Sequence, residues 1–575
     1  MSETRRVAIV GAGPAGTALS LGLLSHGIAV TLVSDRTAEE VRSGGVTSSQ
    51  ITFESALRIE AALGIDALLP ASPALEHMTF TASRRDGSTA AFTAPFGTPA
   101  HSIDQRLRLP LLMDEIEKQG GKLVVRAATV DDLDDLARTH DLVVVSTGRG
   151  GLASLFEPNR EWSPFTRPQR HASLSYLAGV EPDPAGPGLR YYRAEGVGEC
   201  FTCPAISAAG PCDIYVVGAV PGGPLDDWAE VSSAEEHVAR LRTQLAGYFP
   251  EEAGRLGADV RLADEGARLT GGLTPCVRHP VGVLPSGVPV LGMADVVVLN
   301  DPVTSQGANN ALKSAAFYLE AITAHTESYD AAWMRRTFDQ FWRGWARWAT
   351  QWNNAWLGPT LPHQRSVLDA AATHAAVAAQ IVAGFDDAKT FDPWWYEADA
   401  ARTFLAAHRD SPRFDLTALR RALGQYATGV TVVTTLDAAG TPRAMTANSF
   451  TSVSLNPPLV LWAASTASSS LPAFEAADRF AVNVLAADQH HLSRQFSTTG
   501  VDKFEGVPVE RSAPPGAPPF IAGAVARFCC RKTHRVEAGD HVVFFGEVES
   551  FDVVGGEPLV FHSGFYRVAT KHPDL

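Results

Sequence analysis

Residues 7–16 read VAIVGAGPAG, and this stretch decides the fold of the first part of the chain. An apolar strand leads into the spaced glycines Gly11, Gly13 and Gly16, where a helix begins. Glycines there allow a tight turn and let a pyrophosphate approach the backbone, while the helix N-terminus offers it unpaired N–H groups. Asp35 follows at the end of the next strand, where an acid can hold a ribose hydroxyl. The pattern favours a dinucleotide site over a purely structural glycine turn.

Outward from this stretch, strand-like and helix-like segments alternate over residues 1–150. The predicted strands are residues 7–10, 29–33 and 141–146, and the predicted helices are residues 15–25 and 110–119. This alternation is typical of an α/β domain with a parallel sheet. Residues 165–300 carry more strands and turns, which predicts a second sheet laid over the first unit.

Residues 329–356 change to a helical pattern with an aromatic stripe. Its members are Phe338, Phe341, Trp342, Trp345, Trp348, Trp352 and Trp356. Spacings of three and four residues place these side chains on one helix face, which favours a packed core over a ligand platform. An Ala-rich helix is predicted at residues 364–383, followed by a looser linker at residues 397–415.

The last part of the chain is rich in short strands separated by Gly, Pro and Asn. They are predicted at residues 430–435, 459–463, 480–484, 524–530 and 541–551. Many short strands with only one or two helices predict a small β-barrel. We therefore expect a fusion point near residue 410, with one domain at residues 1–408 and a second at residues 409–575.

Composition limits the partners of the chain. It has 575 residues and a formal net charge of −15, which disfavours a nucleic-acid partner. No apolar run approaches the length of a membrane span and no secretory signal precedes the first strand, so we expect a cytoplasmic protein with no membrane partner. The six cysteines include the pair Cys200 and Cys203. Their number and spacing favour buried thiols over disulfides, a redox pair or half a zinc site.

Three distant segments indicate which dinucleotide is bound. They read SIDQRLRLPLL at 102–112, LVVVSTG at 142–148 and LGMADVVVLNDPVTSQGANN at 291–310. In this order they resemble the FAD-dependent aromatic monooxygenases, and among these the two-component styrene and indole monooxygenases, over nearly all of residues 1–400. The resemblance implies an α/β, Rossmann-like FAD-binding domain of the aromatic-hydroxylase type.

The same resemblance implies individual FAD contacts. Asp35 and Arg36 would meet the adenosine side, Arg106 the pyrophosphate side and Asp295 the ribityl chain. The remaining implied contacts are Gly11, Gly13, Pro14, Ala15 and Gly16 in the first turn, and Pro302, Gly307, Ala308 and Asn309 along the isoalloxazine ring. Backbone donors at a helix N-terminus favour the anionic reduced flavin. Without the family, Arg106 fits a surface salt bridge equally well.

Two departures from the family pattern have consequences. The family's Gly-Asp stands here as Ala294-Asp295, which bears on how closely the backbone approaches the flavin. The chain's Asp-Gly pair is Asp86-Gly87, in a hairpin-like turn and not in the segment that receives NADPH in single-component hydroxylases. We therefore expect that the first half does not reduce its own flavin.

The second half carries a different resemblance. The segments YATGVTVVTT (426–435), AMTANSFTSVSLNPP (444–458), FAVNVL (480–485) and GDHVVFFGE (539–547) resemble the small split-barrel flavin reductases that partner two-component monooxygenases, over about residues 415–570. The implied flavin contacts are Thr446, Ala447, Asn448 and Ser449 at the ring edge, and Ser465 and Ser469 in a Ser-rich turn suited to phosphate oxygens. His541 would be the catalytic residue beside the nicotinamide. The alternatives are a solvated loop for the serines and a structural strand histidine bonded to Asp540.

Together the two halves predict a self-contained flavin monooxygenase. NADH would reduce FAD in the C-terminal domain, and the N-terminal domain would use reduced FAD and O₂ to epoxidise indole or a styrene-like alkene through a C4a-hydroperoxyflavin. No metal site is needed, and a homodimer through the reductase domain is expected.

The substrate wall is predicted at residues 44–53 (GGVTSSQITF), with Thr47, Ser49 and Ile51 as candidates against a surface-loop alternative. Their polarity favours indole over a bare hydrocarbon. Two other functions remain open. One is a flavin-dependent halogenase fused to a reductase, which would need a lysine deep in the pocket. The other is a non-enzymatic flavin redox sensor.

Overall fold

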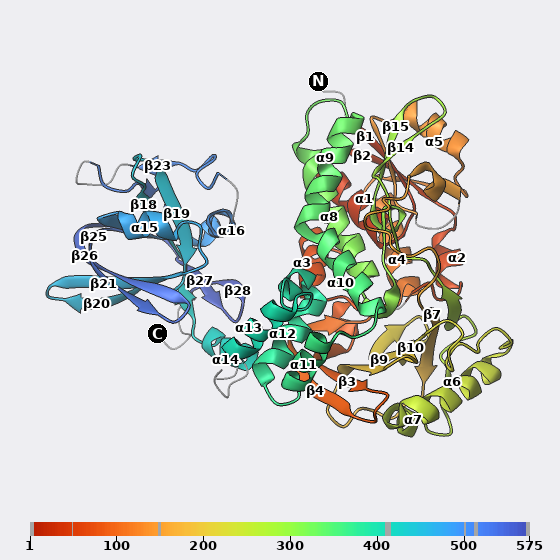
Figure 1. Cartoon of the computed structure of the whole chain (residues 1–575). Coiled ribbons are helices and arrows are strands. Elements are labelled where there is room, and N and C mark those ends of the chain that lie inside the picture. Colours follow the sequence, from red (N-terminus) through yellow and green to blue (C-terminus); the bar gives the residue numbers. More distant parts are fainter. Residues whose placement is uncertain are drawn as a thin grey trace. The chain divides into compact units, whose positions relative to one another are not determined.

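The computed structural model describes residues 5–48, 50–147, 151–408, 416–498, 502–510 and 516–570. The chain forms two compact units, Met1–Asp415 and Leu416–Leu575. The predicted domain boundary at residues 408 and 409 borders residues 409–415, which lie outside the described residues, so it stays a prediction. Figure 1 shows the helices and strands of both units.

The first sheet of unit 1 contains the predicted parallel strands. Its order is β14-β15-β6-β1-β2-β5, with β1 (Arg6–Val10), β2 (Ala29–Ser34), β5 (Lys122–Val125), β6 (Leu142–Val145), β14 (Val281–Val283) and β15 (Pro289–Gly292). The strand β1 pairs in parallel with both β2 and β6, and only β14 runs antiparallel to its neighbour. Apolar strands such as Leu142–Val145 are buried throughout, as in a sheet covered on both faces.

Helices cover this sheet. They are α1 (Pro14–Ser25), α2 (Ala38–Arg42), α3 (Glu54–Leu63), α4 (Gln105–Lys118), α5 (Val130–Ala137) and α8 (Gly307–Ala324). Helices α1 and α8 pack side by side although nearly 300 residues separate them in the chain (Figure 1). The N-terminal glycine turn and the Gln306–Asn309 turn therefore lead into two helices that pack on each other in one layer.

The second sheet confirms the strand-rich middle of the sequence. Its order is β11-β7-β10-β9-β8-β3-β4, with β12 joined to β7. The bounds are β3 (Ala74–Ser83), β4 (Thr89–His101), β7 (His171–Ala178), β8 (Gly188–Ala194), β9 (Gly198–Ser207), β10 (Gly210–Ala219), β11 (Arg261–Leu262) and β12 (Arg268–Gly272). Helices α6 (Ala234–Tyr248) and α7 (Pro250–Arg255) lie beside it (Figure 1). Asp86-Gly87 lies in the β3–β4 hairpin, as predicted, where Gly87 has a φ of +82°.

A group of helices completes unit 1. It contains α9 (Ala331–Phe341), the π-helical turn η5 (Trp342–Ala346), α10 (Arg347–Leu357), α11 (Pro362–Ala371), α12 (Ala375–Asp386) and α13 (Ala398–His408). The aromatic stripe is core, as predicted, with Phe338, Phe341, Trp352 and Trp356 buried and the other three partly buried. Among the described residues no single helix is long and apolar enough to cross a membrane. The pair α11 and α12 meets that length and composition only when taken together, and it is bent by 115°.

Two sequence predictions in this region are wrong. The helix predicted at residues 364–383 is two helices, because the backbone N–H groups of Thr373 and His374 turn back to the Ala370 carbonyl. The linker predicted at residues 397–415 is helical over Ala398–His408. This helix is fixed by packing, since the Phe404 ring stacks on Trp394 with the ring centroids 4.3 Å apart.

Unit 2 contains a seven-stranded sheet of order β19-β18-β22-β25-β26-β21-β20. Its strands are β18 (Thr431–Leu436), β19 (Pro442–Ala447), β20 (Thr451–Leu455), β21 (Pro458–Ser465), β22 (Arg479–Val484), β25 (Ala526–Ala538) and β26 (His541–Val553). Smaller sheets join β17 (Thr428–Gly429), β27 (Leu559–His562) and β28 (Phe565–Val568), and β23 (Val509–Glu510) with β24 (Phe520–Ile521). The helices are α14 (Leu416–Gly424), α15 (Leu471–Ala476) and α16 (His490–Ser497).

A small β-barrel was predicted, and a closed barrel is not seen among the described residues of unit 2, because the edge strands β19 and β20 do not pair. A side chain takes the place of the missing strand contact. The Ser449 hydroxyl donates to the Ala463 carbonyl at 3.0 Å and accepts from the Ala463 N–H at 2.9 Å. One serine side chain therefore satisfies both backbone hydrogen-bonding groups of Ala463 at this edge of β21.

The structure describes all six cysteines, and it shows no disulfide between them. Five are buried, as predicted, whereas Cys276 is partly exposed. Cys529 and Cys530 pack into different hydrophobic clusters, which agrees with their predicted placement on opposite faces of one strand.

Candidate functional site

The glycine turn joins β1 to α1. Gly11 has a φ of +118°, a conformation that favours glycine, and its N–H donates to the Val33 carbonyl at 2.9 Å. A Cβ built on Gly16 would lie 1.9 Å from the Gly11 carbonyl oxygen, so the strand and the helix touch there. A Cβ built on Gly13 would have no atom within 4 Å. Pro14 and Ala15 form the first residues of α1. The turn thus has a packed side at Gly16 and an open side at Gly13.

Asp35 and Arg36 follow β2, at the same edge of the parallel sheet as the glycine turn. The Asp35 carboxylate is 71% exposed and lies 3.7 Å from the Arg36 guanidinium. The Ser34 hydroxyl donates to the Arg36 carbonyl at 2.6 Å, which fixes the backbone after the strand. The structure leaves the Asp35 carboxylate accessible for a ribose.

Arg106 is buried near the start of α4, and it is not a surface residue. Its guanidinium donates to both oxygens of Asp264, at 2.8 and 2.9 Å, and to the Asp104 carboxylate at 2.9 Å. A further bond at 3.2 Å reaches the Gly44 carbonyl. Arg106 therefore joins the start of the predicted substrate segment to the loop before β12.

A second turn lies between the first sheet and α8. Ala294 has a φ of +56°, so this position adopts the conformation that favours glycine although it carries a side chain. Asp295 follows in the turn η3 (Ala294–Val296), and Pro302 begins the turn η4 (Pro302–Thr304). Helix α8 starts at Gly307, followed by Ala308, and a Cβ on Gly307 would meet no atom within 4 Å.

Asn309 connects the start of α8 to the predicted substrate segment. Its side-chain amide donates to the Ile51 carbonyl at 2.8 Å and to the Ser305 carbonyl at 2.9 Å. Its side-chain oxygen accepts from the Phe53 N–H at 3.0 Å. Ile51 is buried, Thr47 is partly buried, and Ser49 lies outside the described residues. The structure thus brings Ile51 and the α8 turn together.

Sequence reasoning missed other residues that hold this segment. The Tyr176 hydroxyl donates to the Ser48 carbonyl at 3.2 Å, and Gln105 contacts Gln50. These contacts join residues far apart in the chain, so no local motif signals them.

In unit 2 the implied flavin residues lie around the edges of β19 and β21. Thr446 and Ala447 end β19, Asn448 and Ser449 follow, and Asn448 is exposed. The Thr446 hydroxyl already donates to the Ser493 carbonyl at 2.7 Å. The Ser-rich turn lies next to β19, because the Ser470 hydroxyl donates to the Ala444 carbonyl at 3.1 Å.

His541 lies beside the Ser-rich turn in the pairing of the two strands. It pairs with Ser465 in the register of β21 and β26, and its Nδ1 lies 2.8 Å from the Asp540 carboxylate. The Thr466 N–H donates to the Asp540 carbonyl at 2.9 Å. The structure therefore brings together Ser465 and His541, and it also shows the Asp540 contact of the alternative interpretation.

Comparison with known proteins assigns both halves. Residues 423–570 match the model "Flavin reductase like domain". The FMN reductase (NADH) SmoA of Agrobacterium fabrum is 45% identical over 26% of this chain and 82% of its own length. This part of the chain belongs to the flavin reductase family. A solved relative, the Streptomyces globisporus NADH:FAD oxidoreductase SgcE6, is 41% identical over 28% of this chain and 96% of its own, with a TM-score of 0.26.

The first half of the chain, which precedes this flavin reductase domain, consists of styrene monooxygenase-type FAD-binding and substrate-binding domains. Residues 4–144 match "FAD binding domain", and residues 148–255 match "Styrene monooxygenase A putative substrate binding domain". Styrene monooxygenase StyA of Pseudomonas sp is 29% identical over 56% of this chain and 78% of its own length. The predicted family is confirmed for both halves.

The residues of the two backbone turns in unit 1 fit the cofactor. The open space at Gly13 and Gly307 lets a ligand approach two backbone turns closely. Buried polar atoms near the second turn have no partner among the described residues, namely the Asn300 amide, Asp301 Oδ2 and Gln306 Oε1. A buried polar atom without a partner costs free energy, so a polar ligand at this turn would satisfy it. The polar edge of a flavin ring has the donors and acceptors to do so.

Lys503 is a residue of the flavin reductase domain for which sequence reasoning predicted no role. Its Nζ donates to the Ala444 carbonyl at 3.1 Å and lies 3.5 Å from the Ser470 hydroxyl. Burial lowers the pKa of this ammonium group. Lys503 places a cation beside the Ser-rich turn, where a phosphate would bind.

The packed side and the open side of the glycine turn predict different effects on stability when one methyl group is added. Gly16→Ala should lower the free energy of unfolding of unit 1 by about 1–3 kcal/mol, because the new Cβ overlaps the Gly11 backbone. Gly13→Ala should leave it unchanged, since its Cβ meets open space. Thermal unfolding of both full-length variants, followed by calorimetry, checks this. Equal stability of the two variants would contradict the packed and open sides.

Proposed function

We propose that the chain is a self-contained flavin monooxygenase that uses NADH, FAD and O₂ to epoxidise indole or a styrene-like alkene. The observation that carries the proposal is the pairing, in one chain, of styrene monooxygenase-type domains with a flavin reductase domain. The first unit would oxygenate and the second would reduce. FAD, when bound, supplies the redox chemistry and the activation of O₂.

In the first unit, the chain's own residues would bind and orient the flavin. Gly11, Gly13 and the start of α1 would receive the pyrophosphate on backbone N–H groups, and Asp35 would accept hydrogen bonds from a ribose. The N-terminus of α8 at Gly307 would place positive dipole charge against the ring, which favours its anionic reduced form. Asn309 would hold the substrate segment against that turn and exclude water.

In the second unit, Thr446–Ser449 would line the flavin ring edge, and Ser465, Ser469 and Lys503 would hold phosphate oxygens. His541 would stand beside the nicotinamide. The finer fold, a split barrel, is proposed from the family. A homodimer through this domain is proposed as well, with support from exposed apolar side chains on two strands of one sheet, Leu455 on β20 at 93% and Phe551 on β26 at 69% exposure.

The halogenase alternative gains no support from the lysines of the first unit. Lys118, Lys122 and Lys389 are exposed. Lys313 is buried, but its Nζ lies 3.2 Å from the centroid of the Trp345 ring and donates to the Asp386 carbonyl at 3.0 Å. Its ammonium group is therefore engaged in structural contacts.

Product analysis tests the proposal. With NADH, FAD and O₂, we expect styrene to give styrene oxide and indole to give an oxygenated product that forms indigo in air. Incorporation of ¹⁸O from ¹⁸O₂ should appear in both products by mass spectrometry. NADH oxidation that yields only H₂O₂ with both substrates would contradict the substrate class, and chlorinated products in the presence of chloride would favour the halogenase.

A further inference from the structure

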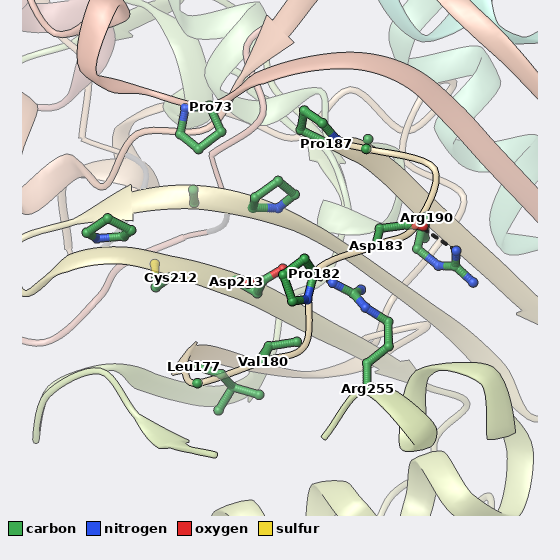
Figure 2. Close-up of a pocket in the computed structure, with 16 residues that line it drawn as sticks. Pro73, Leu177, Val180, Pro182, Asp183, Pro187, Arg190, Cys212, Asp213 and Arg255 are labelled. Atoms are coloured by element: carbon green, nitrogen blue, oxygen red, sulfur yellow. Dashed lines mark hydrogen bonds and ion pairs between the residues drawn. The ribbon is translucent and has the colours of Figure 1, made fainter. Parts of the chain in front are cut away.

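A cavity of about 390 Å³ lies at one end of the second sheet, away from the residues assigned above. Figure 2 shows its wall, with Cys212 and Asp213 on a strand, proline rings around them and Arg255 reaching in from a helix. Five of its lining residues are prolines, namely Pro73, Pro182, Pro187, Pro204 and Pro211. Because proline fixes its own backbone φ, such a wall is rigid before any ligand arrives and lowers the ordering cost of binding.

The cavity is separate from the candidate flavin site although it lies largely within the substrate-binding-domain match. Both sites touch β10, but at opposite ends. Cys212 and Asp213 line the cavity at the start of the strand, whereas a Cβ on Gly218 would lie 3.1 Å from Val303 in the turn before α8. Six residues of extended strand separate Cys212 from Gly218, which is roughly 20 Å.

The charges around the cavity favour a cation over an anion. Each of its two arginines is already shared between carboxylates. Arg190 pairs with Asp183, Glu251 and Glu252, and Arg255 pairs with Asp213 and Glu252. Four carboxylates therefore face two guanidinium groups. An added anion would find no unshared guanidinium among these residues, while an added cation would reduce the excess negative charge.

Asp213 is the acceptor that such a cation would meet. Its Oδ1 lies 3.3 Å from the Arg255 guanidinium, a long contact, and its Oδ2 has no hydrogen bond in the part of the chain that the structure describes. The carboxylate is 17% exposed and lines the cavity. One carboxylate oxygen is thus available in a proline-lined space whose other lining charges, Asp183, Arg190 and Arg255, are engaged in ion pairs.

We propose that this cavity is a second ligand site, which takes a small flat apolar molecule bearing an amine, with the ammonium group donating to Asp213. Proline rings give the apolar body flat C–H surfaces to pack on, and the carboxylate selects the charge. The site does not depend on the proposed oxygenation, because none of its residues belongs to the flavin or substrate contacts.

Tryptamine is the probe, and isothermal titration calorimetry of the full-length protein is the measurement. We expect saturable tryptamine binding and none of comparable affinity for indole-3-acetate, which has the same ring and the opposite charge. Asp213→Asn should weaken tryptamine binding at least about tenfold, the loss expected for a buried charge-assisted hydrogen bond. Asp339→Asn, at an exposed position on α9, is the matched control and should bind as the parent does.

A second variant guards against misfolding of Asp213→Asn. Val180→Trp fills the cavity from its loop wall and leaves every charge in place, so it should also abolish binding. Circular dichroism and the thermal unfolding of unit 1 in both variants report whether that unit remains folded. Tryptamine binding that survives both substitutions, equal binding of indole-3-acetate, or no tryptamine binding at all would each overturn the proposal.

The pH dependence offers an independent check. Burial raises the pKa of the Asp213 carboxyl to about 6, while Arg255 lowers it and Glu252 and Asp183 raise it. The other titratable neighbours are Cys203, Cys212 and Tyr215, whose pKa values burial raises far above neutrality, so they stay neutral. Binding needs the carboxylate and an amine that is still protonated. We therefore expect tryptamine affinity to be full above pH 7 and to fall as the pH drops through about 6.

Discussion

Gly13→Val should abolish oxygenation by the full-length protein while NADH-dependent flavin reduction continues unchanged. A valine at this position fills the space into which the pyrophosphate must come to reach the backbone N–H groups. Nothing in the protein occupies that space, since a Cβ there has no atom within 4 Å, so the variant should fold. We expect FAD affinity of the first unit to fall more than about 100-fold, which is ~2.7 kcal/mol. Product yield and flavin fluorescence titration measure the two effects.

Gly247→Val is the matched control for this prediction. Gly247 lies in α6 and a Cβ there also has no atom within 4 Å, so the same side chain is added at a neutral place. Oxygenation should survive in the control. Full oxygenation by Gly13→Val as well would mean that the open side of the turn does not receive the cofactor.

Residues 1–408 expressed alone should oxidise NADH at least about 100-fold more slowly than the whole chain. His541, the residue proposed to stand beside the nicotinamide, lies in the other compact unit. The Asp86-Gly87 pair of the first unit lies in a hairpin between β3 and β4 and offers no nicotinamide site. The rate of NADH absorbance loss in the presence of FAD measures the effect.

The truncated protein should still form product when chemically reduced FAD is supplied with O₂ and styrene. That result shows that the fragment is folded and that only the hydride step is missing. Appreciable NADH oxidation by the fragment would refute the division of labour between the two units.

Local patterns predicted those parts of the fold that local physics determines. The strands at residues 7–10, 29–33 and 141–146 are short, apolar and buried on both faces, so their composition alone identifies them. The glycine turn was equally predictable, because only glycine tolerates the φ of Gly11. The aromatic stripe on α9 and α10 followed from helical spacing.

Long-range contacts explain what the sequence did not predict. The helix at Ala398–His408 looked like a linker because Trp394, on which Phe404 packs, gives no signal of its own. The burial of Arg106 in an ion pair gives no local signal, because its partner Asp264 lies 158 positions away; the sequence offered only a surface salt bridge as the alternative to the implied pyrophosphate contact. The barrel was expected from the number of short strands alone. Its closure depends on the pairing of β19 with β20, whereas the Ser449 hydroxyl bonds to the edge of β21 instead.

The three hydrogen bonds of Asn309 have a consequence for the order in which ligands are held. This one side chain ties the start of α8 to the backbone on both sides of Thr52, so the turn proposed to meet the flavin and the proposed substrate wall share a single support. Binding equilibria that share a support are reciprocal: the factor by which bound flavin raises alkene affinity is the factor by which bound alkene raises flavin affinity. The protein should therefore retain its reduced cofactor longest when an alkene is present, and release it soonest when there is nothing to oxidise.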